Sequence, residues 1–193
     1  MDKIIICATS QAGEADLKSA RLGTRFGRLD LSSQLALLAV EWLGVDFETY
    51  PRDRIAICLA ARAGSLSTDI DFWQGRSAVG GPSPTLFAYT LPSAALGEIA
   101  IRHRLTGPGL CLVGGSENVL PEAEALLRRG EADACVCVFC EVVSFAAANI
   151  IQASPTARAC ALFLKRGGDG PHVLPESDRD LESLCAGFRP GQR

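Results

Sequence analysis

The sequence lacks any apolar run close to the roughly 18 residues that a membrane-spanning helix needs. Its first apolar run, Lys3–Ala8, is also too short for the core of a signal peptide. Neither sign of charge is in large excess, because 19 basic residues face 22 acidic ones and the formal net charge is -3. We therefore expect a cytoplasmic protein with no membrane span and no affinity for nucleic acid.

Histidine and nucleotide-binding motifs are also scarce. The 193 residues include two histidines, His103 and His172. The glycine pair Gly114–Gly115 is followed by no Walker lysine, and no G-x-G-x-x-G fingerprint is present. These absences disfavour nucleotide binding, and we expect no cofactor.

Cysteine, in contrast, is plentiful, with eight residues that lie mostly inside apolar runs. That placement favours reduced, buried thiols over a disulfide framework. Cys135, Cys137 and Cys140 form the densest group, and three thiols in six residues are typical of zinc or iron-sulfur ligation. The run reads as a strand, however, so Cys135 and Cys137 should share one face and Cys140 the other. Buried packing is the favoured interpretation, and metal binding stays open as an alternative.

Strand-like and helix-like segments alternate along the chain, which is typical of an α/β domain. Strands are predicted over Lys3–Ala8, Arg54–Ala61, Gly109–Val113, Ala132–Val143 and Arg158–Lys165. Arg54–Ala61 is a near-continuous apolar run typical of a strand buried on both faces, and Gly109–Val113 is predicted as a short buried strand. Helices are predicted over Leu31–Leu43 with Asp30 as N-cap, Gly64–Gln74, Pro92–Arg102, and Asn118–Arg129 closed by Gly130. The segments Gln11–Thr24 and Ala146–Thr156 are predicted as connections. We expect residues 1–165 to form one domain and residues 166–193 to be a polar, flexible C-terminal tail with a short helix over Asp178–Ala186.

Ser116 is the first candidate for chemistry, because it follows Gly114–Gly115 at a turn from a short strand into a helix. Backbone N–H groups and the helix dipole at such a turn lower the pKa of a thiol or stabilise an oxyanion. A serine there needs a base to take its proton, and His103 is the candidate. The favoured interpretation is that Ser116 caps the following helix by accepting a backbone hydrogen bond.

Several sequence blocks, in the right order over most of residues 26–165, resemble the N-terminal half of a β-ketoacyl synthase of the thiolase superfamily. The blocks are F-G-R-L-D-L-S-S-Q-L-A-L-L-A-V-E-W-L from Phe26, D-R-I-A-I-C-L-A-A-R-A-G-S from Asp53, S-P-T-L-F-A-Y-T-L-P-S-A-A-L-G-E-I-A-I-R from Ser83, G-P-G-L-C-L-V-G-G-S ending at Ser116, R-R-G-E-A-D-A-C-V-C-V-F-C-E ending at Glu141, and A-R-A-C-A-L-F-L-K ending at Lys165. The resemblance implies a thiolase-like layered α/β/α half-fold with a mixed central sheet, and a ketosynthase N-terminal-like domain over residues 1–165.

Three departures from the family pattern bear on activity. The position of the family's nucleophilic cysteine is Ser116, the glycines before Glu141 are replaced by Val138-Phe139-Cys140, and the half that carries the family's two histidines is missing. Claisen chemistry needs the thiolate and the imidazoles on one substrate. The resemblance therefore implies a vestigial site and no independent activity.

Within the superfamily, a subunit without the cysteine resembles a chain length factor, which pairs with an active ketosynthase. The resemblance implies a homo- or heterodimer that pairs through Gly109, Leu110, Cys111, Leu112 and Val113. It also implies an exposed apolar sheet face where the second half is missing. Arg21–Arg28 and Arg102–Arg104 are predicted as solvated surface, and docking of the acidic surface of an acyl carrier protein there stays open as an alternative. The expected setting is a type II fatty acid or polyketide system, for example aryl polyene assembly.

Two alternatives remain open at this point. In the first, the protein is an acyl-thioester transferase or hydrolase with Ser116 as nucleophile and a base such as His103. In the second, it is a metal-binding protein that uses Cys135, Cys137 and Cys140.

Overall fold

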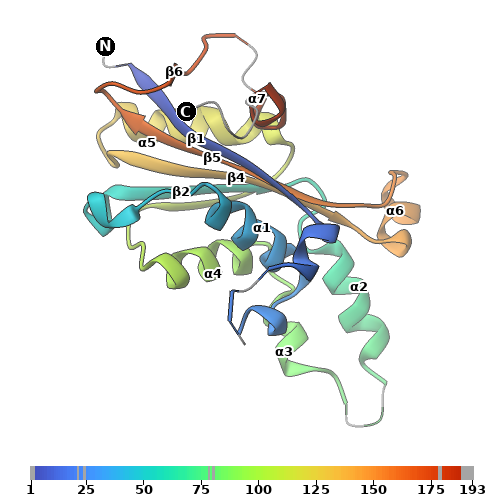
Figure 1. Ribbon diagram of the computed structural model, residues 1–193. Helices are drawn as coiled ribbons and strands as arrows, with labels where there is room; N and C mark the ends of the chain where they lie inside the picture. Colours follow the sequence, from blue (N-terminus) through green and yellow to red (C-terminus); the bar gives the residue numbers. More distant parts are fainter. Residues whose placement is uncertain are drawn as a thin grey trace.

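The computed structural model describes residues 3–20, 22–23, 25–77, 79, 81–177 and 180–187, which form a six-stranded mixed sheet between layers of helices (Figure 1). The strands are β1 (Ile4–Gly13), β2 (Ile55–Ala61), β3 (Gly109–Val113), β4 (Ala134–Val143), β5 (Thr156–Arg166) and β6 (His172–Val173). The helices are α1 (Leu31–Trp42), α2 (Leu66–Gly75), α3 (Pro84–Phe87), α4 (Ser93–His103), α5 (Val119–Arg128), α6 (Phe145–Ile151) and α7 (Leu181–Gly187). The described residues also form short 3-10 helices, which are η1 (Glu14–Lys18), η2 (Phe26–Arg28), η3 (Phe47–Thr49), η4 (Arg52–Arg54) and η5 (Ser116–Asn118).

The strand order in the sheet is β3-β2-β4-β5-β1-β6. β2 runs parallel to both β3 and β4, whereas β5 is antiparallel to β4 and β1 is antiparallel to β5. The carboxyl ends of β2, β3 and β4 therefore meet on one side of the sheet and their amino ends on the other. We call these two sides the carboxyl end and the amino end of the parallel strands.

Helices cover both faces of this sheet (Figure 1). α1 and α4 pack on the face that carries Ile57 and Val136, and α5 and α7 pack on the face that carries Cys58 and Phe139. Every residue of β2 and β4 is buried, as the continuous apolar runs predicted. The mixed sheet and the three layers confirm the expected thiolase-like α/β/α half-fold. No helix in the described ranges is long and apolar enough to cross a membrane.

The strongest local signals lie where they were predicted. The carboxylate of Asp30 caps α1, because its Oδ1 accepts a hydrogen bond from the backbone N–H of Ser33 at 3.1 Å. Pro92 immediately precedes α4. Gly130 follows the last turn of α5 with φ of 72°, a conformation that glycine adopts without strain.

Three local predictions need correction. β3 is not a buried strand: it pairs with β2 alone among the described strands, and its terminal residues Gly109 and Val113 are exposed. The segment Ala146–Thr156 is not a plain connection, because α6 occupies its first part and is capped by Ser144, which accepts from the N–H of Ala147 at 3.2 Å. The segment Gln11–Thr24 begins as strand, since β1 continues to Gly13 before η1.

Part of the segment after Arg166 packs against the sheet. β6 pairs with β1, and α7 buries Leu181 and Cys185 on the α5 face. The prediction that a missing half leaves an apolar sheet face exposed is therefore wrong, because α5 and α7 cover that face. The helix predicted over Asp178–Ala186 is observed from Leu181, and residues 178–179 and 188–193 lie outside the described residues. The domain boundary at residue 165 stays a prediction.

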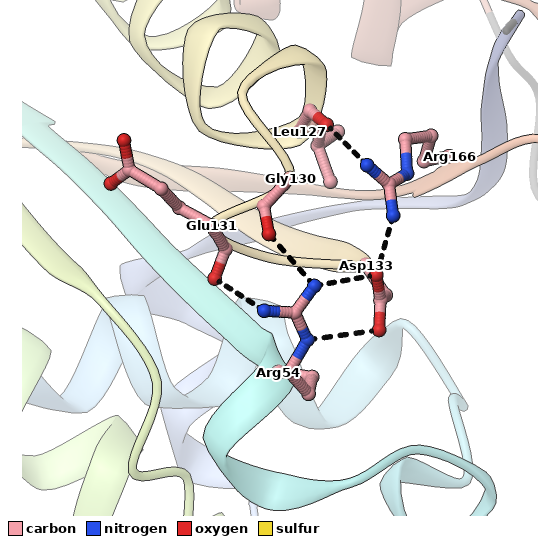
Figure 2. Close-up of polar contacts among 6 residues, drawn as sticks. All are labelled: Arg54, Leu127, Gly130, Glu131, Asp133 and Arg166. Carbon is pink, nitrogen blue, oxygen red and sulfur yellow. Dashed lines mark hydrogen bonds and ion pairs between the residues drawn. The ribbon is translucent and has the colours of Figure 1, made fainter.

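At the amino end of the parallel strands, two arginines donate hydrogen bonds to one carboxylate (Figure 2). Arg54, just before β2, makes a bidentate contact with Asp133, with Nε to Oδ2 at 3.0 Å and Nη2 to Oδ1 at 2.9 Å. Arg166, at the end of β5, donates from Nη2 to the same Oδ1 at 2.9 Å. Bidentate guanidinium–carboxylate pairs fix geometry as well as energy. This contact explains the aspartate of the R-R-G-E-A-D block as a structural residue.

The same two arginines also satisfy carbonyl groups at the end of α5. Arg54 Nη2 donates to the carbonyl of Gly130 at 2.8 Å, and Arg166 Nη1 donates to that of Leu127 at 3.3 Å (Figure 2). The last carbonyls of a helix have no partner inside the helix, so cationic donors there are favourable. The cluster therefore ties α5 to three strands of the sheet.

Gly107, in the G-P pair before β3, also lies at the amino end. A Cβ at this position would fall 2.3 Å from the carbonyl oxygen of Ile55 and 3.0 Å from that of Asp53. Both are backbone atoms that cannot rotate away. The close approach of the two segments therefore requires glycine.

Candidate functional site

The chain turns sharply between β3 and α5, and Ser116 lies in this turn. β3 ends at Val113, Gly114 and Gly115 follow, and η5 begins at Ser116 before α5 starts at Val119. The turn places Ser116 at the carboxyl end of the parallel strands. Ser116 is 1% exposed, so its hydroxyl is closed off from solvent.

The partner of this hydroxyl is a carboxylate from the C-terminal segment. Ser116 Oγ donates a hydrogen bond to Asp180 Oδ2, and Asp180 Oδ1 accepts from the backbone N–H of Ser183 at 2.8 Å. Asp180 thus caps α7 and holds Ser116 at the same time. Burial acts to raise the pKa of Asp180, but the hydrogen bonds from Ser116 and Ser183 outweigh it and lower the pKa.

The capping interpretation of Ser116 is wrong. Neither η5 nor α5 has a side-chain cap, and the Ser116 hydroxyl donates to Asp180 instead of accepting from a backbone N–H. The sequence held no signal for this contact, because 64 residues separate its two members.

Four more charged side chains surround the turn, two of each sign. Arg62 Nε lies 3.6 Å from Glu141 Oε2, and Arg158 Nε lies 2.8 Å from Glu182 Oε1 on α7. Burial raises the pKa of Glu141, and Arg62 and Arg158 partly counter that effect. Each charge thus has an opposite charge nearby, and α7 brings the acidic partner to Arg158.

The arrangement at Ser116 does not support nucleophilic catalysis. A serine hydroxyl attacks a carbonyl carbon only when a base takes its proton. The group that faces Ser116 is Asp180, whose lowered pKa makes it a poor proton acceptor. Since α7 also covers the turn, an acyl thioester does not reach the hydroxyl while α7 stays in place. The contact therefore fastens α7 to the turn.

The structure does not bring His103 to Ser116. His103 ends α4, its ring lies 4.8 Å from that of Phe47, and its carbonyl accepts from Arg52 Nη1 at 2.9 Å. These neighbours place His103 at the amino end of β3, whereas Ser116 follows the carboxyl end. Five strand residues lie between, which is roughly 16 Å. His103 therefore cannot serve as the base that the enzyme alternative requires.

The three clustered cysteines are divided between the faces of the sheet, as the alternation predicted. Cys135 and Cys137 lie in the core beneath α5 with their sulfur atoms 3.8 Å apart. Cys140 lies in the opposite core and donates to the carbonyl of Ser32 at 3.3 Å. Burial raises the pKa of the Cys137 and Cys140 thiols. Because these three thiols cannot meet at one ion, the metal-binding alternative is wrong.

The predicted partner strand, Gly109–Val113, forms one edge of the sheet. Leu110, Cys111 and Leu112 are half-buried, and Val113 is 71% exposed. Its outer side has no pairing strand in the described part of the chain. An apolar edge strand is a template for another chain unless something covers it.

The two arginine-rich segments lie side by side. Arg102 Nη1 donates to the carbonyl of Leu22 at 3.1 Å, while its Nε pairs with Glu41 at 2.6 Å. Arg25 pairs with Glu98 at 3.0 Å across the same surface. Arg28 and Arg104 are exposed, and Arg21 lies outside the described residues. The structure thus gathers basic side chains that are distant in sequence.

The layers, the strand order and the turn at Ser116 define the ketosynthase fold, and comparison with solved structures shows it directly. No protein-family model and no curated protein sequence matches the chain. Among solved structures, the ishigamide ketosynthase/chain length factor is similar, with a TM-score of 0.68 and 20% identity over 90% of this chain and 64% of that one.

Two further structures share the fold. A ketosynthase in complex with its chain length factor from Xenorhabdus doucetiae matches with a TM-score of 0.63 and 18% identity, over 86% of this chain and 80% of that one. A type II polyketide synthase acyl-carrier protein in complex with its ketosynthase matches with a TM-score of 0.70 and 13% identity, over 86% of this chain and 63% of that one. The chain spans less than two thirds of the ishigamide and type II chains.

Proposed function

We propose that this protein is a non-catalytic ketosynthase-like subunit of chain length factor or scaffold type, in a type II fatty acid or polyketide system such as aryl polyene assembly. It pairs with an active β-ketoacyl synthase in the cytoplasm. The observation that carries the proposal is the closed turn: the residue at the nucleophile position is a buried serine whose hydroxyl is hydrogen bonded to Asp180.

The relatives by fold support a paired assembly. The Xenorhabdus doucetiae structure is a ketosynthase with its chain length factor, and this chain covers 80% of the matched chain. A subunit with a closed turn contributes to condensation by binding and shaping a partner that holds the nucleophile. In that role the partner supplies the chemistry.

We place the partner on the edge strand β3. Its half-buried Leu110, Cys111 and Leu112 and its unpaired backbone suit addition of a strand from the partner. Backbone hydrogen bonds would extend the sheet across the interface, and the apolar side chains would be removed from water.

We place acyl carrier protein on the basic surface around Arg28 and Arg104. Such a contact needs positive charge with few competing carboxylates, and these two side chains make no ion pair among the described residues. Because the charges are exposed, this binding should weaken as salt rises.

The test is co-purification with the catalytic ketosynthase encoded nearest to this protein's gene. We expect a complex with wild type and with Ser116→Ala, and equal condensation of an acyl carrier protein-bound substrate in both. A β3 variant, Cys111→Pro, should lose the complex because proline removes a backbone donor and disrupts strand pairing. Val173→Asp, on exposed strand β6, is the matched control and should keep it.

Two results would count against the proposal. The first is a wild-type chain that purifies as a stable monomer in the presence of the ketosynthase. The second is an acyl adduct on wild type that disappears in Ser116→Ala, since it would show that the serine is reactive.

A further inference from the structure

Two helices, α2 and α3, project from the sheet (Figure 1). We call them the arm, defined as the described residues between Gly64 and Pro92, which include α2 and α3. Of the ten residues of α2, Ser67 and Thr68 are the buried ones, and both are polar. α3 has no buried residue. Leu66 and Ile70 of α2 pack on Val143, Ala147 and Ala148, so one side of this helix is covered. Apolar side chains outside that contact are of the kind that packs against another molecule.

Large apolar side chains of the arm face water. Trp73 is 64% exposed, Phe87 is 61% exposed and Leu91 is 63% exposed. Phe87 packs on Phe72 with ring centroids 5.3 Å apart, so the two helices present their aromatic residues together. The guanidinium of Arg76 lies 4.0 Å from the Trp73 ring centre and holds the indole in place. Exposed tryptophan held in a fixed position is typical of the centre of an interface.

The arm is continuous with the edge strand β3. A Cβ on Gly64 would lie 3.3 Å from Pro92 Cγ and 3.7 Å from Val113 Cγ2, so the base of the arm meets the end of β3. Ser65 Oγ donates to the carbonyl of Thr90 at 2.6 Å and closes the base. The exposed side chain of Val113 thus adjoins the segment that carries Leu91.

The area of β3 alone is too small for a stable complex. A five-residue strand is roughly 16 Å long and a sheet is about 10 Å thick, so this edge offers on the order of 160 Å². A stable interface takes about 800 Å² from each partner. The remaining area has to come from a neighbouring surface, and the arm is an apolar surface that adjoins β3.

We propose that the arm is the second half of the partner interface, with Trp73 and Phe87 as its anchors, and that its occupant is the catalytic ketosynthase subunit. This inference rests on the function proposed above. The ketosynthase is the occupant in place of a second copy, because two copies would bring together two closed turns and no nucleophile. The partner presents an apolar surface that receives an indole and a phenyl ring.

The chain holds two tryptophans, which supplies an internal control. Trp42, on α1, is 46% exposed and lies outside the arm. With 5-fluorotryptophan incorporated into this chain alone, the two ¹⁹F signals are assigned from Trp42→Phe and Trp73→Phe. Unlabelled ketosynthase should shift the Trp73 signal and leave the Trp42 signal in place.

Substitutions then measure the contribution of each anchor. Trp73→Ser should raise the dissociation constant about 30-fold, and Trp42→Ser should leave it within about twofold. Because Trp73 is exposed, the variant should keep the wild-type melting temperature, which separates lost binding from lost folding.

Each other outcome overturns a defined part of the argument. If the complex forms but the Trp73 signal stays unchanged, the arm is not part of the interface, and the proposed function still stands. If wild type forms no complex with the ketosynthase, both proposals fail. If the Trp73 signal moves with this chain's own concentration in the absence of ketosynthase, the occupant is a second copy and our assignment of the partner is wrong.

Discussion

The two ends of the parallel strands differ in what their polar residues do. At the amino end, Gly107 permits a close backbone approach, and Asp133 joins Arg54 and Arg166 to the last turn of α5. At the carboxyl end, the hydroxyl of Ser116 in the turn after β3 is hydrogen bonded to Asp180, which caps α7. The polar contacts at the amino end thus hold strands and α5 together, whereas the contact at the carboxyl end fastens one short helix.

The comparison predicts that the amino end is the more sensitive to substitution, and Gly107→Ala should show the largest effect. Its new Cβ would lie 2.3 Å from the carbonyl oxygen of Ile55, so the backbone has to move. We expect a loss of about 3 kcal/mol in the free energy of unfolding, measured by urea denaturation. Gly97→Ala in α4, where nothing lies within 4 Å, should be neutral or stabilise by up to about 1 kcal/mol.

If Gly107→Ala and Gly97→Ala unfold at the same urea concentration, the close approach at the amino end is not rigid. The contrast between the two ends would then have to rest on the charge cluster alone.

The charge cluster should show the next largest effect. Asp133→Ala removes three hydrogen bonds from guanidinium groups, but the carboxylate is 40% exposed and solvent screens part of the interaction. We expect a loss of about 1.5 kcal/mol. Glu131→Ala, in the exposed pair with Arg129, should stay within about 0.5 kcal/mol of wild type.

The stabilisation that Asp133 provides should decrease as pH falls. Hydrogen bonds from Arg54 lower the pKa of Asp133 in the folded state. The contribution of Asp133 to stability is therefore fully present above the pKa of about 3.9 that it has in the unfolded chain. It is lost as pH falls through the pKa that Asp133 has in the folded chain. A difference between wild type and Asp133→Ala that persists unchanged to the lowest measurable pH would contradict this account.

At the carboxyl end, Ser116→Ala should cost less than the loss of Asp133. It removes one hydrogen bond to Asp180, which is worth about 1 kcal/mol. The experiment is sharpened by Ser116→Cys, whose thiol would face the Asp180 carboxylate and lie beneath α7. We expect iodoacetamide to label it at least about tenfold more slowly than Ser77→Cys, which is exposed, as measured by peptide mass. Equal labelling rates would show that α7 does not cover the turn.

Local contacts could be predicted from the sequence and distant ones could not. Asp30 was identified as a cap because the groups that it binds lie three residues away. The strand β2 followed from an unbroken apolar run. The pairs Arg54–Asp133 and Ser116–Asp180 join residues 79 and 64 positions apart, and no local pattern encodes which strand ends meet. The capping interpretation of Ser116 failed for that reason.

Two errors had a different cause. Helix α6 was missed because Phe145 and Ile150 face solvent, so its apolar residues do not form the one-sided pattern of a packed helix. The missing half was expected to leave a sheet face open, but α7 covers it with Leu181 and Cys185, two residues from a segment of polar composition. Composition averaged over a segment hides its few apolar residues, of which Leu174, Leu181 and Cys185 are buried on this face.

The smallest effect should come from His103, a half-buried titratable group at the amino end. Burial lowers its pKa, Arg102 and Arg52 act in the same direction, and Glu41 at 3.6 Å partly opposes them. The unfolded chain therefore binds the proton more tightly than the folded one, so stability should fall as pH decreases from about 7 through the folded pKa. His103→Phe should remove that slope while keeping the ring packed near Phe47, whereas His172→Gln should keep the His103 contribution. Unfolding curves at pH 7.5, 6.5 and 5.5 decide the matter, and a slope that survives in His103→Phe would assign the titration to another group.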